Sequence, residues 1–200
     1  MQVQETAVQT DRIVTLPNAL TVVRLLAIPV FVWLALGPKN DAAAALVLVG
    51  IGVTDWADGY LARKWNQITR FGQLMDPIAD RLATFATLLV FLVRGVVPWW
   101  LVAILIARDV VLALEMSRLK AHGVTGLPVN FVGKAATAML LGSFPLLLWG
   151  AQAESGFLQL VYAIGAGLAL WGVGLYLYSA WLYLRQGRAV RAQLATPAVG

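Results

Sequence analysis

Four aspartates lie close together in a chain that is otherwise mostly apolar. Asp55 and Asp58 are three residues apart, and Asp76 and Asp80 are four residues apart. On helices each pair shares one face, so two such helices side by side would bring four carboxylates together. Carboxylates in that number repel one another, and hard divalent cations such as Mg²⁺ or Mn²⁺ relieve the repulsion. The spacing therefore predicts a divalent-metal site.

The composition predicts that these aspartates belong to a membrane protein. Of the 200 residues, 60% are hydrophobic and 12% are charged, with a mean hydropathy of +0.77. A soluble chain of this length could not bury so much apolar surface. The cations behind the net charge of +5 are scattered between apolar stretches, which favours anionic lipid over nucleic acid as the partner. With no cysteine and one histidine, disulfides are excluded and a histidine-based zinc site is disfavoured.

Apolar stretches separated by turn residues predict an all-α fold with six transmembrane helices. The second expected span carries Asp55 and Asp58 near its end. The third follows Asp76, which either caps it before Pro77 or lies in a helix that starts earlier and kinks there. A polar segment (1–15) would precede the six-helix domain (16–184), and a basic, flexible tail (185–200) would follow it. The expected spans are residues 16–36, 42–61, 77–93, 99–119, 131–149 and 157–183.

The distribution of lysine and arginine predicts how the spans are oriented. Both termini and the loops 63–72 and 118–130 would share one side, which collects most of the cations. The opposite turns hold only Lys39 and Arg94. We therefore expect an integral protein of a bacterial inner membrane, with both termini and the aspartates facing the cytoplasm.

The aspartates also belong to a longer pattern, D-x2-D-G-x2-A-R-x8-G-x3-D-x3-D, which runs from Asp55 to Asp80. This pattern resembles the signature of the CDP-alcohol phosphatidyltransferase family, and all of its fixed positions match. The resemblance implies six membrane helices, with the motif on the second and third, and a homodimer. It also implies an enzyme that transfers a phosphatidyl group from CDP-diacylglycerol to an alcohol and releases CMP.

The resemblance further implies roles for the motif residues. Asp55, Asp58 and Asp76 would bind metal, with two ions expected. Asp80 would complete the metal site and take the proton from the acceptor hydroxyl. Arg63 would contact the pyrophosphate as a fixed cation. The other CDP-binding positions, which leave room for the nucleotide, would be Gly59, Ala62 and Gly72.

Residues outside the motif are expected to bind the acceptor. The segment from Pro17 to Arg24 resembles the phosphatidylglycerol branch of the family, and its polar side chains share one face. The pair Arg108-Asp109, followed later by Gly133-Lys134, resembles family members that use phosphatidylglycerol and form cardiolipin. Phosphatidylglycerol is therefore the acceptor we favour. Glycerol 3-phosphate is the alternative, because several cations would suit its phosphate. The expected acceptor residues are Asn18, Thr21, Arg24, Arg108, Arg118 and Lys134.

Other interpretations stay open from the residues alone. The aspartates could form a structural network with nearby arginines, and Arg108, Asp109 and Glu115 could form internal ion pairs within their span. Inositol phosphate is a third acceptor. A divalent-cation carrier or a structural membrane protein is a different class, and metal-dependent release of CMP would separate it from an enzyme.

Overall fold

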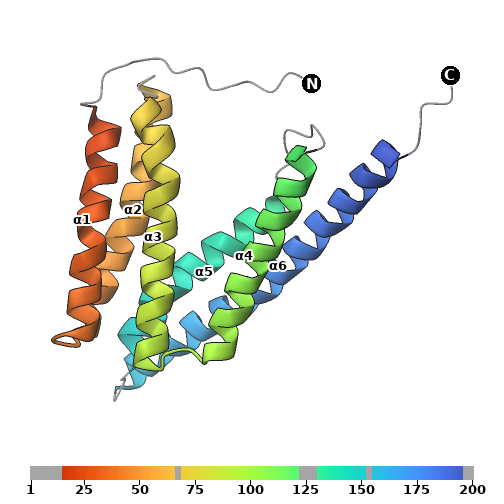
Figure 1. Cartoon of the computed structure of the whole chain (residues 1–200). Coiled ribbons are helices and arrows are strands. Elements are labelled where there is room, and N and C mark those ends of the chain that lie inside the picture. The colour runs from red at the N-terminus through yellow and green to blue at the C-terminus, as the bar shows by residue number, and fades with distance from the viewer. Residues whose placement is uncertain (1–14, 66–68, 122–129, 152–154, 196–200) are drawn as a thin grey trace. The chain divides into compact units, whose positions relative to one another are not determined.

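The computed structural model describes residues 15–65, 69–121, 130–151 and 155–195 (Figure 1), without the side chains of residues 63 and 192–195. This part of the chain is entirely helical, apart from short connections. The prediction of an all-α fold is confirmed. Its helices are α1 (Leu16–Leu36), α2 (Asp41–Lys64), α3 (Arg70–Arg94), α4 (Trp99–Ala121), α5 (Phe131–Gly150) and α6 (Gly156–Ala195).

Local capping signals set the limits of the first helices. The Thr15 hydroxyl accepts a hydrogen bond from the Asn18 amide at 3.4 Å, and Pro17 lies in the first turn, where its missing donor costs little. Asn40 caps α2 in the same way, accepting from the Ala43 amide at 3.0 Å. Gly95, with φ at +67°, ends α3 in the left-handed conformation that glycine adopts easily.

Helix α3 begins before Asp76, which was one of the two starts considered from the sequence. The alternative that Asp76 caps the helix is wrong, because Thr69 is the cap and accepts from the Gly72 amide at 2.9 Å. Pro77 lies inside the helix, where it removes one backbone donor without ending it. As a result, Asp76 and Asp80 lie one turn apart on a continuous helix.

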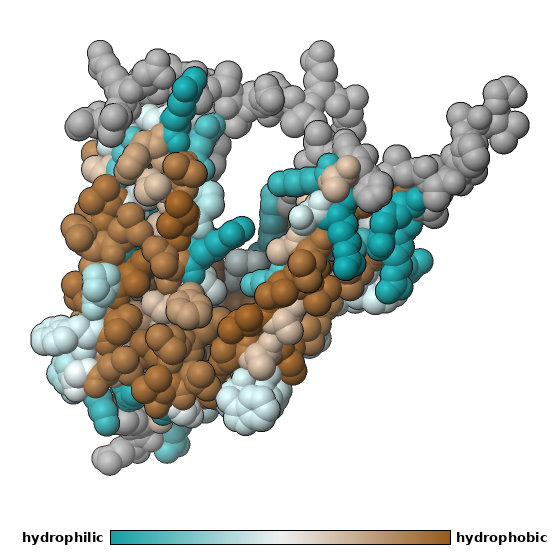
Figure 2. Space-filling model, in the orientation of Figure 1, coloured by the Kyte–Doolittle hydropathy of each residue, from teal (hydrophilic) through white to brown (hydrophobic). Residues whose placement is uncertain are grey.

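Four of the described helices are long and apolar enough to cross a membrane, namely α1, α2 as far as Ala62, α5 and α6. These helices identify an integral membrane protein. Charged side chains along α3 and α4 keep those two helices outside this group. Large apolar side chains lie at the surface, and in Figure 2 the hydrophobic colour covers most of the visible face of α1 and α3. Such a surface suits lipid rather than water.

The prediction of a flexible tail from residue 185 is wrong as far as Ala195, because α6 continues through it. The helix has 40 residues. At about 1.5 Å per residue it is about 60 Å long, roughly twice the thickness of a bilayer's hydrocarbon core. The segment that carries Arg185, Arg188 and Arg191 therefore prolongs α6 well beyond the length needed to cross a membrane.

The helices form two units, each described here by itself. The first comprises residues 1–96 and 144–162, and the second comprises 97–143 and 163–200. In the first unit, α1 packs against both α2 and α3 (Figure 1). Arg94 ties one end of these three helices together, donating to both carboxylate oxygens of Asp41 at 2.7 and 3.0 Å and to the Ala35 carbonyl at 2.8 Å. The motif aspartates lie toward the other end.

Candidate active site

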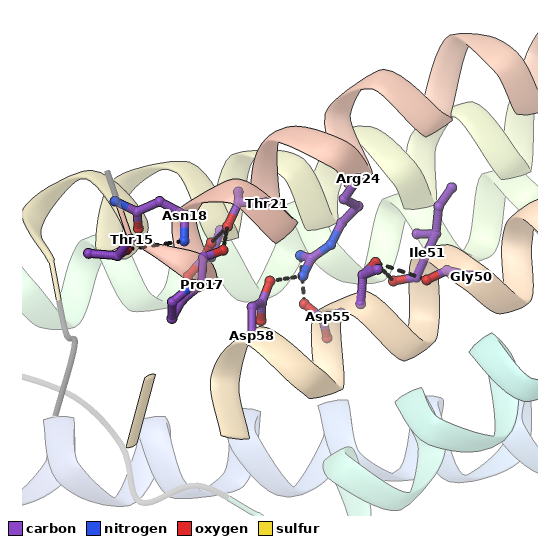
Figure 3. A network of polar contacts seen from close by, with 11 residues as sticks. Thr15, Pro17, Asn18, Thr21, Arg24, Gly50, Ile51, Asp55 and Asp58 are labelled. Carbon is purple, nitrogen blue, oxygen red and sulfur yellow. Dashed lines mark hydrogen bonds and ion pairs between the residues drawn. The ribbon is translucent and has the colours of Figure 1, made fainter. Parts of the chain in front are cut away.

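Arg24 of α1 reaches into the first pair of motif aspartates on α2 (Figure 3). Its Nη1 lies 2.7 Å from Asp55 Oδ1, and its Nη2 forms an ion pair with Asp58 Oδ2. The arginine and Asp58 side chains are only 1% and 5% exposed, whereas Asp55 is 49% exposed. A buried charge requires a partner, so Arg24 and Asp58 each explain the burial of the other.

The same face of α1 also contacts the second pair of aspartates, on α3. The Thr21 hydroxyl donates to Asp76 Oδ1 at 2.6 Å, and the Thr69 hydroxyl donates to Asn18 Oδ1 at 2.8 Å. A Cβ atom at Gly72 would lie 3.0 Å from Asn18 Oδ1 and 3.2 Å from Thr69 Oγ1. Gly72 therefore allows α1 and α3 to approach closely beside Asp76.

These contacts change how the α1 residues are interpreted. The sequence predicted that Asn18, Thr21 and Arg24 bind the acceptor. In the structure they are buried, Thr21 and Arg24 contact motif aspartates, and Asn18 contacts the cap of α3. Their role toward an acceptor stays a prediction, whereas the contacts of Thr21 and Arg24 with the motif aspartates are observed.

One face of α1 contacts three of the motif carboxylates: Arg24 pairs with Asp55 and Asp58 of α2, and Thr21 bonds to Asp76 of α3. Asp80 lies one turn beyond Asp76 on α3, and its side chain is exposed. The two pairs predicted from spacing therefore lie on helices that both pack against α1.

The donor set fits a hard divalent cation in type, because the carboxylates and the Thr21 hydroxyl offer only oxygen, and because Asp55 and Asp58 already surround a positive charge. Within the described residues, no three acidic, histidine or cysteine side chains lie close enough together to bind one ion. Here the guanidinium of Arg24 supplies the charge that Asp55 and Asp58 require.

The residues predicted to contact CDP are only partly tested. Gly59 and Ala62 lie on α2 beside Asp58 and are partly buried. The side chain of Arg63 falls outside the described part of the chain. Gly72 is buried at the contact between α1 and α3. Their roles toward the nucleotide stay predictions.

The second unit contains a cavity of about 530 Å³ between α4, α5 and α6. Arg108 and Lys134, predicted from the sequence, both line it, together with polar side chains and an apolar wall. Its size lies in the usual range for small-molecule sites, about 300–1,000 Å³. The remaining lining residues are Leu112, Asn130, Gly133, Thr137, Ala138, Leu141, Tyr176 and Tyr183.

Sequence analysis missed the residues that α6 adds to this region. Tyr176 and Tyr183 line the cavity, and Ser179 accepts a hydrogen bond from Arg108 at 3.5 Å. These three side chains are spaced at three and four residues, so they share one face of a helix that is otherwise largely apolar. That periodicity was the available signal, although it could not show which helix the face contacts.

Glu115 does not line this cavity, and it forms an ion pair with a residue of α6. Its Oε1 lies 2.6 Å from Arg191 Nη2, and a Cβ at Gly187 would come within 2.7 Å of the same oxygen. An ion pair within its own span was one of the interpretations left open for this residue, but its partner is Arg191 of α6; the pair within the span is the one between Arg108 and Asp109, at 3.0 Å. Arg118, near the end of α4, is exposed and does not line the cavity.

The family model of CDP-alcohol phosphatidyltransferases matches residues 14–178, which include the motif and all of the cavity's lining residues except Tyr183. The chain belongs to the CDP-alcohol phosphatidyltransferase family. It is therefore a transferase, as the motif predicted, and its family is generally dependent on divalent metals.

Relatives of known name align over most of their length. A protein of Streptomyces coelicolor named cardiolipin synthase (CMP-forming) is 45% identical, over 98% of this chain and 93% of the relative. A protein of Shigella flexneri named CDP-diacylglycerol–glycerol-3-phosphate 3-phosphatidyltransferase is 33% identical, over 82% and 94%. One of the same name from Yersinia pestis is 35% identical, over 83% and 94%. The names of the relatives thus include both a cardiolipin synthase and phosphatidyltransferases that name glycerol 3-phosphate.

Proposed function

We propose that this transferase is a cardiolipin synthase, which transfers the phosphatidyl group of CDP-diacylglycerol to phosphatidylglycerol and releases CMP. The observation that carries the proposal is the cavity of the second unit, where Arg108 and Lys134 lie beside the apolar side chains of Leu112 and Leu141. This lining suits a phosphodiester headgroup that remains attached to a lipid. The Streptomyces coelicolor relative, which spans nearly the whole chain, supports the same acceptor.

The motif would carry out the transfer. Bound to Asp55, Asp58 and Asp76, Mg²⁺ or Mn²⁺, as two ions, would supply the positive charge that offsets a pyrophosphate. Asp80 would accept the proton of the acceptor hydroxyl, whose oxygen forms the new bond to the lipid-bearing phosphorus while the bond from that phosphorus to CMP breaks. Because Asp80 is exposed, it can then release the proton to water.

Thr21 and Arg24 would hold the carboxylates in place for this reaction. Thr21 orients Asp76 through a hydrogen bond of 2.6 Å, and Arg24 keeps Asp55 and Asp58 together. Arg63 would add a cation for the pyrophosphate. Gly59, Ala62 and Gly72 would leave space for the nucleotide.

We place this site at the cytoplasmic face of a bacterial inner membrane, in a six-span homodimer with both termini in the cytoplasm. The length of α6 supports this orientation, because its long basic extension suits a surface of anionic lipid on the positive-inside side.

Glycerol 3-phosphate is the second candidate acceptor, because relatives of 33% and 35% identity carry that substrate in their names. Arg108 and Lys134 would then bind a phosphomonoester. The apolar side chains of Leu112 and Leu141 beside these cations suit a lipid better than a small hydrophilic phosphomonoester, so we favour the lipid.

The deciding experiment uses purified protein, CDP-diacylglycerol and a divalent cation. Phosphatidylglycerol or glycerol 3-phosphate is offered separately, and CMP and the lipid product are both measured. Cardiolipin formed only with phosphatidylglycerol is the expected result. Product formed only with glycerol 3-phosphate would establish the alternative, inositol phosphate would be tried next, and no CMP with any acceptor would contradict the proposal.

A further inference from the structure

The guanidinium of Arg108 is held by side chains of both α4 and α6. Nη1 donates to Asp109 Oδ1 at 3.0 Å, and Nη2 donates to Ser179 Oγ at 3.5 Å. The ring of Tyr176 covers one face of the guanidinium, with its centroid 3.8 Å from the central carbon. A cation over an aromatic face is attracted by the ring's electron density, so Tyr176 adds to the fixation.

Tyr176 and Asp109 are also bonded to each other. The Tyr176 hydroxyl donates to Asp109 Oδ1 at 2.6 Å, and this is the same oxygen that accepts from Arg108. The three side chains therefore form a closed triangle, in which Tyr176 holds Arg108 both through its ring and through the carboxylate.

The triangle fixes a long side chain that is itself largely buried. Arg108 and Asp109 are sequence neighbours, and their side chains are 13% and 56% exposed. Fixing the guanidinium has a direct consequence for binding, since a long side chain that is already ordered loses less entropy when a ligand binds.

The guanidinium also retains donors for a ligand. It carries five N–H groups, and two hydrogen bonds to described side chains, one from Nη1 and one from Nη2, use only part of them. Because Arg108 lines the cavity, the remaining donors suit an anionic group of a bound ligand. Lys134, on the α5 wall of the same cavity, offers a second cation to the same ligand.

We propose that Tyr176 and Asp109 are positioning residues that hold Arg108 ready to bind the phosphate group of the acceptor. The inference deepens the proposed function and rests on it, since it takes this cavity as the acceptor site. In this proposal both residues act through the guanidinium, although Tyr176 also lines the cavity.

The test compares Tyr176→Phe, which keeps the ring and removes the hydroxyl, with Tyr176→Leu, which removes both. We expect the acceptor KM to rise about tenfold in the first variant, the equivalent of one hydrogen bond to a charged group, and further in the second. The KM for CDP-diacylglycerol and the kcat at saturating acceptor should stay within about twofold of the parent, because the motif lies on other helices.

Two further variants separate positioning from general damage. Asp109→Asn should resemble Tyr176→Phe, and the double variant should be no worse than either single one, because both act on the same guanidinium. Tyr178→Phe is the matched control, since Tyr178 lies on the same helix but is 50% exposed and stacks on Trp181 at 5.7 Å between ring centroids. It should leave both KM values unchanged.

The outcomes distinguish this inference from the proposed function. If the parent protein uses glycerol 3-phosphate rather than phosphatidylglycerol, the cardiolipin proposal fails, while the same rise in the KM for glycerol 3-phosphate still supports positioning. If no acceptor is turned over, calorimetric titration with glycerol 3-phosphate replaces KM, and tenfold weaker binding in Tyr176→Phe supports the inference. Equal effects on donor and acceptor, additive effects in the double variant, an unchanged acceptor KM, or no binding by the parent would each overturn it.

Discussion

The guanidinium of Arg24 forms ion pairs with both Asp55 and Asp58, and thereby joins the first helix to the first half of the aspartate motif. A divalent cation bound by the same two carboxylates would have to displace the guanidinium of Arg24. The arginine therefore has two consequences that can be measured: it stabilises the metal-free protein, and it competes with metal for the carboxylate oxygens.

Replacing Arg24 with Gln should destabilise the protein most strongly when metal is absent. Asp58 would be left buried without its partner, which typically costs about 3–5 kcal/mol. Thermal unfolding in detergent, followed with a chelator and then with Mg²⁺ or Mn²⁺, measures the effect. We expect the metal to raise the melting temperature of the variant more than that of the parent.

Arg94→Gln provides the control for this prediction. It breaks another buried ion pair of the same unit, with Asp41, at the end of the helices away from the motif. Metal should not rescue this variant beyond the rise seen in the parent. If metal stabilised both variants equally, competition between Arg24 and the cation would be refuted.

Thr21→Val should weaken the positioning of Asp76. The substitution keeps the shape of the side chain but removes the hydroxyl that donates to Asp76 Oδ1 at 2.6 Å. Hydrogen bonds to charged groups are worth about 1.5–3 kcal/mol, so both stability and CMP release should fall. Thr87→Val is the matched control, because that buried hydroxyl donates only within its own helix, to the Ala83 carbonyl at 2.8 Å. A variant at position 21 with the activity of this control would count against the assignment.

Gly72→Ala should separate α1 from α3. The added methyl group would lie 3.0 Å from Asn18 Oδ1, so either the hydrogen bond to Thr69 or the spacing of the helices must change. Overpacking of this kind costs about 1–3 kcal/mol. Gly52→Ala, on α2, meets nothing within 4 Å and should be neutral or stabilise by up to about 1 kcal/mol. Equal melting temperatures for the two variants would show that the contact at Gly72 tolerates a methyl group.

The helices and the motif could be predicted from the sequence because both depend on local patterns. Apolar length predicts a membrane helix, and the spacing of Asp55, Asp58, Asp76 and Asp80 predicts shared faces. The start of α3 could not be predicted in the same way, since Thr69 and Asp76 are both plausible caps and the sequence alone does not choose between them.

The partners of these residues depend on which faces meet in the folded protein. Asn18, Thr21 and Arg24 were recognised as one polar face, yet nothing in their spacing showed that the face contacts the motif aspartates. Tyr176 was missed for the same reason, because its significance comes from contacts with Arg108 and Asp109 on another helix.

Asp80→Asn should abolish turnover while leaving the protein folded. Asp80 is exposed, so the substitution removes a proton acceptor without leaving a buried group unpaired. General-base catalysis contributes about 10²–10⁴-fold, and kcat should fall by that factor while the melting temperature hardly changes. Arg81→Gln alters the charge at the neighbouring exposed position and should retain most of the activity. Substantial turnover by the Asp80 variant would remove this residue as the base.

Lys134→Ala should weaken binding of the acceptor without affecting the donor. Lys134 lines the cavity with Arg108, and the loss of a cation that binds a phosphate oxygen should raise the acceptor KM about tenfold or more. Lys120→Ala is the control, because Lys120 is an exposed cation of α4 that does not line this cavity. Steady-state kinetics with each substrate varied in turn distinguishes the two sites. An equal rise in both KM values would mean that Lys134 acts on the donor or on the fold, and the cavity would then lose its assignment to the acceptor.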